Sequence, residues 1–180
     1  MTRDQLEHAI RAACDVADDT EVWVFGSQAI LGQFPDAPNG LRRSFEADIA
    51  PVNHPERVDR IDGALGEGSL FHRTHGFYVH GVPIETAKLP LGWEVRVHAV
   101  RHPVYTRGNT GWCVEAHDLA ASKLIAYRAK DRDFVRLLLA EDLISGDTLV
   151  ERLEGIAVEP ALREQAVRWT RLTLRELSPP

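Results

Sequence analysis

The sequence predicts an α+β protein in which a mixed β-sheet with flanking helices is followed by a C-terminal helical unit. Short runs rich in β-branched and aromatic residues alternate with helical patterns over the first two thirds of the chain. From His117 onward, only helical patterns follow. We therefore expect a sheet domain over residues 1–115 and a helical subdomain over residues 116–180.

Composition and charge are those of an ordinary globular protein. The chain has 180 residues, of which 44% are hydrophobic and 27% charged. Its net charge of −6 argues against a general nucleic-acid-binding surface. Residues 95–136 nevertheless hold eight Lys or Arg and four Asp or Glu. Such a basic segment is either a solvated helix face or a local anion site.

The location of the protein is predicted from the charged residues that interrupt its apolar runs, and the redox state of its cysteines is predicted from their spacing. Charged residues break every run before it reaches the length of a membrane span, and the N-terminal stretch lacks a signal-peptide core. We expect a cytoplasmic protein without a membrane partner. Cys14 and Cys113 lie far apart and lack metal-ligand spacing, so we expect them to be reduced thiols in the core.

The first elements follow from periodicity and from turn residues. Apolar residues spaced three and four apart predict a helix over residues 3–17, and "EVWVFGS" predicts a strand that stops at Gly26. Ser27 is placed to cap a short helix through "QAILGQ". After the loop "FPDAPNG", the run "SFEADIAPV" predicts the second strand.

The remaining elements are predicted in the same way. "HPERVDRIDGALG" is typical of a helix, with Pro55 in its first turn and Gly66 at its end. Strands are expected in "GFYVHG", "VPIETAKL" and "WEVRVHAV", and a turn is expected at Gly108-Asn109 within "VYTRGNTGWCV". One helix is expected over residues 117–144. A second is expected to start in "SGDTLVERLEGIAV", and a third is expected over "PALREQAVRWTRLTLREL".

Two acids two residues apart in the second strand are the first functional candidates. Side chains alternate along a strand, so Glu46 and Asp48 should project from the same face. Adjacent carboxylates repel each other, and divalent cations such as Mg²⁺ take carboxylate oxygens. The pair therefore indicates either a metal clamp or an exposed, solvated strand face.

Other polar residues are weaker candidates when taken one at a time. Backbone N–H groups at the Gly26-Ser27 strand-to-helix turn could hold a phosphate. Glu85 is a third acid in a strand-like run, and it matters if that strand lies beside the one carrying Asp48. Lys123 and Lys130 share a helix face if their helix is continuous. The histidines of "HRTHGFYVH" lack further ligands at a familiar zinc spacing.

The order of these motifs resembles the nucleotidyltransferase superfamily with a polymerase-β-type core. The matching segments are "VFGSQA", "FEADIAP", "PIETA" and "DLAASKLIAYRAKDRDFVRLLL". The last segment is similar to the AbiEii/MenT-type branch, whose members include toxins of bacterial toxin–antitoxin pairs. The basic and acidic residues that stand in its places are Lys123, Arg128, Lys130, Asp131 and Asp133. The resemblance spans roughly residues 22–140.

The resemblance implies a role for each motif. Glu46 and Asp48 would ligate Mg²⁺, with Glu85 as a third carboxylate that activates the acceptor hydroxyl. The nucleotide-binding residues implied are Gly26, Ser27, Lys123, Arg128, Lys130 and Asp133. The reaction would transfer NMP from an NTP to an acceptor such as the 3′ end of tRNA, and a cognate antitoxin would be the protein partner. The alternatives are an enzyme that transfers AMP to a protein, and a degenerate member that binds a nucleotide or a partner without turnover.

This chain departs from the family pattern at two places. The first metal acid is Glu46 where Asp is commoner, and Glu is one methylene longer. The spacer between Ser27 and Glu46 has eighteen residues, which an extended loop containing "FPDAPNGLRR" accounts for.

Overall fold

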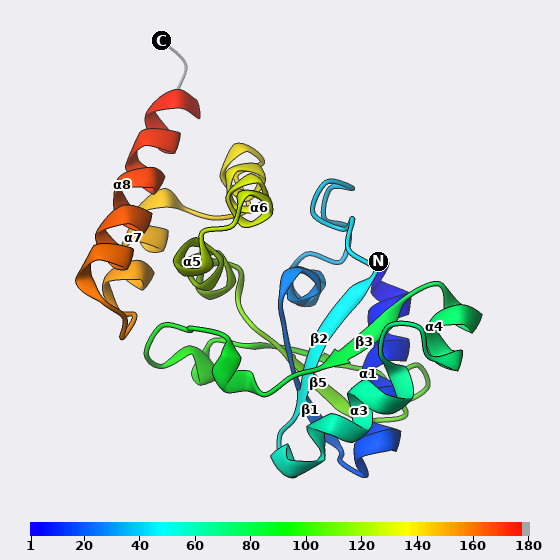
Figure 1. Cartoon of the computed structure of the whole chain (residues 1–180). Helices are drawn as coiled ribbons and strands as arrows, with labels where there is room; N and C mark the ends of the chain where they lie inside the picture. The colour runs from blue at the N-terminus through cyan, green and yellow to red at the C-terminus, as the bar shows by residue number, and fades with distance from the viewer. Residues whose placement is uncertain (178–180) are drawn as a thin grey trace. The chain divides into compact units, whose positions relative to one another are not determined.

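The computed structural model describes residues 1–177, which form two compact units (Figure 1). The sheet unit comprises Met1–Ala87 and Val97–Glu115. The helical unit comprises Lys88–Arg96 and the residues from Ala116 onward. The predicted α+β class, with a mixed sheet and a C-terminal helical part, is confirmed. The division into domains at residue 115 stays a prediction, and residues 88–96 lie with the helices.

The sheet unit contains a mixed five-stranded sheet in the order β3-β2-β1-β5-β4. Its strands are β1 (Glu21–Phe25), β2 (Glu46–Pro51), β3 (Tyr78–Gly81), β4 (His98–Arg101) and β5 (Thr110–Cys113). The central strand β1 pairs antiparallel with β2 and parallel with β5, and β2 pairs parallel with β3. The parallel β2–β3 pair brings together side chains that are about thirty residues apart in sequence.

The helices of this unit bury the apolar side chains of the sheet. They are α1 (Arg3–Ala17), α2 (Ile30–Gln33), α3 (Val58–Leu65) and α4 (Leu70–His75), with 3-10 turns η1 (Ser27–Ala29), η2 (Pro55–Arg57) and η3 (Ile84–Thr86). Helix α1 begins at a capping box in which Thr2 and Gln5 satisfy each other's backbone N–H groups. It packs on β1, β2 and α3, while α2 packs on β4 and β5 (Figure 1). The predicted helix over residues 3–17 is confirmed.

Both cysteines lie in this core as free thiols, as predicted. Cys14 is 1% exposed and Cys113 is fully buried. Burial raises the pKa of the Cys113 thiol to about 12. Burial, followed by the nearby carboxylates of Asp19 and Asp15, raises the pKa of Cys14 to about 12.

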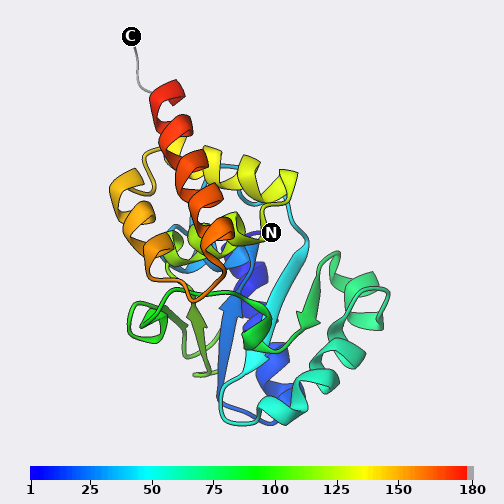
Figure 2. The ribbon, with the colours of Figure 1, turned by 60° about the vertical axis from the view of Figure 1, so that its left-hand side comes forward.

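The helical unit consists of α5 (Ala116–Ala126), α6 (Ala129–Ala140), α7 (Gly146–Glu154), α8 (Pro160–Leu177) and the 3-10 turn η4 (Trp93–Val95) (Figure 2). Asp118 on α5 is fully buried and holds the 88–96 segment to this unit. The Arg96 guanidinium donates two hydrogen bonds to its carboxylate, at 2.8 and 3.0 Å. Arg152 Nε lies 3.2 Å from the same carboxylate. A bidentate pair of this kind orients the segment as well as neutralising the charge.

Three predictions of regular structure are wrong. The helix expected through residues 117–144 breaks between α5 and α6, because Tyr127 adopts a left-handed φ of 54°. The strand expected in "WEVRVHAV" forms only at β4, after the η4 turn that follows left-handed Gly92. The strand expected in "VPIETAKL" is the 3-10 turn η3, because Pro83 lacks the N–H that would continue a ladder.

Candidate functional site

Strand β2 presents its two acids on the face opposite its core side chains. Ala47 and Ile49 are fully buried, whereas the side chains of Glu46 and Asp48 are 32% and 25% exposed. This alternation confirms that the two carboxylates share one face of the strand. They are held by a rigid sheet and remain open to ions from solvent.

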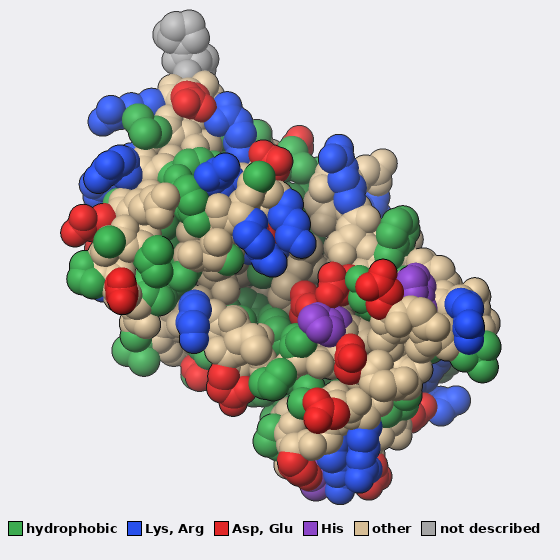
Figure 3. All heavy atoms as spheres, in the orientation of Figure 1, with side chains coloured by type: hydrophobic (Ala, Val, Ile, Leu, Met, Phe, Trp, Pro, Cys, Tyr) green, Lys and Arg blue, Asp and Glu red, His purple; other side chains and the backbone are tan. Residues whose placement is uncertain are grey.

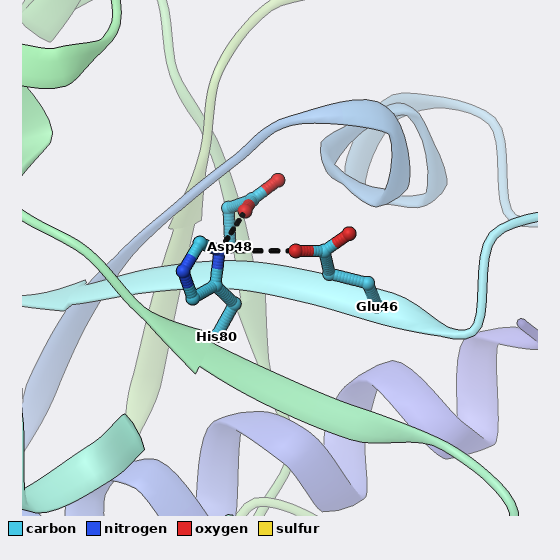
Figure 4. A group of neighbouring side chains, drawn as sticks. All are labelled: Glu46, Asp48 and His80. Carbon is cyan, nitrogen blue, oxygen red and sulfur yellow. Dashed lines mark hydrogen bonds and ion pairs between the residues drawn. The ribbon is translucent and has the colours of Figure 1, made fainter. Parts of the chain in front are cut away.

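Strand β3 places a third side chain, His80, beside this pair. In the parallel register of β2 and β3, Asp48 lies opposite His80. His80 Nδ1 lies 3.0 Å from Glu46 Oε1 and 3.1 Å from Asp48 Oδ1 (Figure 4). We call these three residues the carboxylate–imidazole cluster. Sequence analysis considered His80 only among the histidines of a zinc site, and it did not place His80 beside the acids, because that position depends on a parallel pairing with a distant strand.

The turn after β1 packs directly against Asp48. Phe25, the last residue of β1, lies opposite Asp48 in the antiparallel ladder, and Gly26 follows with a φ of +68°. A Cβ atom on Gly26 would lie 1.8 Å from Asp48 Oδ2. Glycine is therefore required at this position both by the backbone conformation and by the close approach of the carboxylate. Ser27 starts the 3-10 turn η1. The predicted binding of phosphate by Gly26 and Ser27 stays a prediction.

The geometry of the carboxylate–imidazole cluster fits a divalent metal ion. One ligand atom from each residue can be chosen so that all three lie within 4.8 Å of one another. Octahedral ligands at about 2.1 Å from a metal are separated by roughly 3.0 Å along each edge. Both distances from His80 Nδ1 match that edge. Two carboxylate oxygens suit ions such as Mg²⁺ and Mn²⁺, whereas the imidazole nitrogen is a ligand better suited to transition metals than to Mg²⁺.

The electrostatic environment of this face favours cations. Tyr78 stands two residues before His80 on β3 and opposite Glu46 in the register. Burial first, and then the carboxylates of Glu46, Glu67 and Asp48, raise the pKa of the Tyr78 hydroxyl. Carboxylates that disfavour a phenolate also attract a metal ion. Figure 3 shows Asp and Glu side chains gathered around His side chains on this part of the surface.

Glu85, the third acid expected at the metal, lies outside the strands of the sheet. It occupies the exposed 3-10 turn η3 beyond the end of β3, and not a strand beside Asp48. The candidate metal group found among residues 1–177 consists of Glu46, Asp48 and His80. The role of Glu85 as a metal ligand or as the group that activates the acceptor stays a prediction.

The predicted basic residues of the helical unit form a cluster around a buried acid. Lys123 Nζ lies 3.4 Å from Asp131 Oδ1 and 4.7 Å from the centre of the Phe134 ring. Arg128 donates to both carboxylate oxygens of Asp131, at 2.6 and 3.3 Å. The Asp131 side chain is 1% exposed. Burial alone would raise its pKa, but the hydrogen bonds and charges of Arg128 and Lys123 hold the pKa below its usual value.

Two further predicted residues of this unit lie outside that cluster. Lys130 and Asp133 are exposed, and neither forms a hydrogen bond or an ion pair within the described part of the chain. Because the helix breaks at Tyr127, Lys123 and Lys130 do not share a face of one continuous helix. Asp131 binds the basic side chains of Lys123 and Arg128. The nucleotide-binding roles of Lys130 and Asp133 stay predictions.

Comparison with known families assigns the chain at a coarse level. A family model described as "Nucleotidyltransferase of unknown function (DUF6036)" matches residues 4–172, so the chain belongs to this family. No curated protein matches the chain, and neither does any solved structure. No helix within residues 1–177 combines the length and the apolar character needed to cross a membrane.

Proposed function

We propose that this member of the nucleotidyltransferase family transfers NMP from an NTP to an acceptor hydroxyl, with Mg²⁺ as its cofactor. The observation that carries the proposal is the carboxylate–imidazole cluster, in which the spacing of Glu46, Asp48 and His80 fits an octahedral divalent ion. These three residues would hold the ion. When bound, it would neutralise phosphate charge and polarise the phosphorus that is attacked.

The proposed reaction is one displacement at the α-phosphorus of the NTP. The acceptor oxygen forms a bond to that phosphorus, while the bond from the phosphorus to the bridging oxygen of the leaving group breaks. Pyrophosphate leaves with the bonding electrons, and the acceptor hydroxyl gives its proton to a base. Holding these groups in line and neutralising their charge supplies most of the catalysis in such reactions. Glu85 is the proposed acceptor-activating carboxylate, although its exposed turn makes solvent a competing base.

The remaining roles are proposed for each unit by itself. Gly26 and Ser27 in the sheet unit would bind phosphate through the backbone N–H groups of the turn after β1. In the helical unit, the basic residues Lys123, Arg128 and Lys130 would contact the triphosphate, and Asp133 would help to order them. The buried Asp131 supports this proposal, because it fixes the positions of Lys123 and Arg128.

The proposed biological class is the AbiEii/MenT-type branch, acting in the cytoplasm. Its support is the segment "DLAASKLIAYRAKDRDFVRLLL", with a Lys-bearing helix followed by an Arg/Lys-Asp element. On this proposal the acceptor is the 3′ end of tRNA, the protein is the toxin of a toxin–antitoxin pair, and a cognate antitoxin binds it. Transfer of AMP to a protein hydroxyl and nucleotide binding without turnover are the competing functions.

One assay separates these functions. The protein is incubated with each labelled NTP, Mg²⁺, total tRNA and a cell extract freed of RNA, beside Asp48→Asn and the surface control Asp59→Asn. Loss of one metal-binding carboxylate should lower transfer by at least about 100-fold, as does the loss of other groups that stabilise charge in a transition state. The control should keep wild-type activity, because Asp59 is exposed on α3 outside the cluster.

The label identifies the acceptor. Label in tRNA with wild type and Asp59→Asn, but not with Asp48→Asn, supports the tRNA-modifying enzyme and reveals its nucleotide preference. Label in extract protein identifies the AMP-type modifier. Nucleotide binding with no label in either fraction identifies a degenerate member and overturns the proposed transfer reaction.

A further inference from the structure

A groove along α8, with Glu154 at the end of α7 as a further lining residue, contains four arginines that take no part in the candidate site. The groove has a volume of about 460 Å³ and lies within the helical unit. Its basic lining residues are Arg163, Arg168, Arg171 and Arg175, all on α8, and its acidic lining residues are Glu154 and Glu164. We call it the arginine groove. Figure 3 shows Lys and Arg side chains clustered over this end of the molecule.

These four arginines have no carboxylate partners. None of them forms an ion pair or a side-chain hydrogen bond within residues 1–177, although two glutamates line the same groove. Neighbouring arginines of this unit behave differently, because Arg136 pairs with Glu176 at 2.6 Å and Arg152 pairs with Asp118. What distinguishes the groove is that four arginines without an ion pair lie together along one helix.

The spacing of these arginines costs stability. Arg168 and Arg171 are three residues apart, and Arg171 and Arg175 are four apart, so like charges face each other along α8. In a chain with a net charge of −6, unpaired arginines at this spacing point to an anionic ligand.

The shape of the groove suits a polynucleotide strand. Arg163 and Arg175 are twelve residues apart, which is about 18 Å along a helix. A nucleic acid strand presents several phosphates over that length. The guanidinium fork matches phosphate oxygens bidentately. Val167 and half-exposed Leu172 add apolar lining that sugars and base faces can contact.

We propose that the arginine groove binds the phosphate backbone of single-stranded RNA. This inference rests on the proposed function, because an RNA acceptor carries both the hydroxyl and the run of phosphates. An AMP-transferring enzyme with a protein acceptor has no need of four unpaired arginines in one groove. The glutamates of the groove weaken phosphate binding, so their neutralisation should strengthen it.

The test measures RNA binding without catalysis. Binding of a fluorescein-labelled oligouridylate is followed by anisotropy over a range of salt concentrations, in EDTA and without NTP. The groove variant is Arg168→Gln/Arg171→Gln/Arg175→Gln. The matched control is Arg60→Gln/Arg73→Gln/Arg101→Gln, which removes the same charge from exposed positions of the sheet unit that form no ion pairs within the described chain. Circular dichroism and thermal melting check that both variants fold.

The expected result is a change of salt dependence that is specific to the groove. Losing three phosphate contacts should reduce the slope of log affinity against log salt by about 2, and lower the affinity at moderate salt by roughly tenfold or more. The control should change the slope by less than half as much. Glu164→Gln should tighten binding, since it removes a carboxylate from the groove.

The outcomes that overturn the inference are distinct from failure of the proposed reaction. Equal losses in the groove variant and the control would show a general charge effect. No binding of RNA by the wild type would refute the inference. Binding of polyglutamate in place of RNA would assign the groove to an acidic protein partner. Asp48→Asn should bind RNA as the wild type does, so an inactive enzyme that still binds RNA through the groove refutes the transfer reaction alone.

Discussion

Two clusters of charged side chains, one in each unit, differ in how their charges are balanced. In the carboxylate–imidazole cluster, two carboxylates share one imidazole, and the three side chains are 25–42% exposed. In the cluster of Lys123, Arg128 and Asp131, two cations share one carboxylate that is 1% exposed. The first cluster has an excess of acid in contact with solvent. The second is closed around its acid.

This difference separates groups that stabilise the fold from groups that are ready to bind a ligand. A buried carboxylate that accepts hydrogen bonds from two cations is costly to leave half-paired, so Asp131 should contribute to stability. Two carboxylates held side by side repel each other, so Glu46 and Asp48 should contribute little to stability in the absence of a cation. The same residue type, Asp, therefore serves opposite purposes in the two units.

The largest expected effect is on folding stability, and it differs between substitution of Asp131 and substitution of Asp48. Asp131→Asn should lower the free energy of unfolding by about 3 kcal/mol, because it removes the charge that holds Lys123 and Arg128. Asp48→Asn should change it by less than about 1 kcal/mol, or raise it, because repulsion from Glu46 is relieved. Urea denaturation followed by circular dichroism measures both. Equal losses for the two variants would show that Asp131 and Asp48 do not differ in their contribution to stability.

The next effect tests whether the close contact between Gly26 and Asp48 keeps the carboxylate–imidazole cluster in its metal-binding geometry. Gly26→Ala places a Cβ against Asp48 Oδ2 and strains a φ of +68°, which should cost roughly 1–3 kcal/mol of stability. The displaced carboxylate should also weaken Mn²⁺ binding, as titration calorimetry would measure. Gly68→Ala is the matched control, because Gly68 has a φ of +77° with open space around its Cβ position. A comparable loss of Mn²⁺ affinity in that control would contradict the role of the contact.

A smaller effect concerns the choice of metal. An imidazole ligand favours Mn²⁺ over Mg²⁺, whereas an all-oxygen set suits Mg²⁺. His80→Asp should therefore lower the preference for Mn²⁺ over Mg²⁺ by about tenfold, or roughly 1.4 kcal/mol. Titration calorimetry measures the two dissociation constants. Pulsed electron paramagnetic resonance of bound Mn²⁺ should show nitrogen coupling in the wild type and none in the variant. An unchanged spectrum would remove His80 from the ligand set.

The smallest effect is the pH dependence of the buried cluster. The pKa of Asp131 is lowered by folding, so its stabilisation is fully present above the unfolded value of about 3.9. It is lost as the pH falls through the lower folded pKa. The stability difference between wild type and Asp131→Asn should accordingly shrink below about pH 4. Urea midpoints recorded between neutral and acidic pH test this, and a constant difference would contradict it.

Local patterns predicted the parts of the site that depend on local geometry. The period-two spacing of Glu46 and Asp48 placed both on one face of β2, and Gly26 marked the end of β1. Strand alternation and glycine turns are short-range properties, so the sequence carries them directly. Family membership at the level of a nucleotidyltransferase was predicted from the same motifs and is confirmed.

The parts that sequence analysis missed depend on long-range pairing or on weak local signals. His80 joins the acids only through the parallel register of β3 with β2, which periodicity does not reveal. The break at Tyr127 occurs without Gly or Pro, although the ring of Tyr127 packs under Arg132 at 4.7 Å. The arginine groove was not predicted, because helical spacing places residues on one face but does not show which distant residue, here Glu154 of α7, lies beside them.

The buried thiols have a practical consequence for measuring these effects. Cys14 and Cys113 are buried with pKa values raised to about 12, so they carry almost no thiolate at neutral pH and resist maleimide reagents. An exposed cysteine introduced at Arg101 would then be the reactive one in the native chain. A single fluorophore or spin label can be attached there without removing either natural cysteine, and the labelled protein keeps an intact core and an untouched arginine groove.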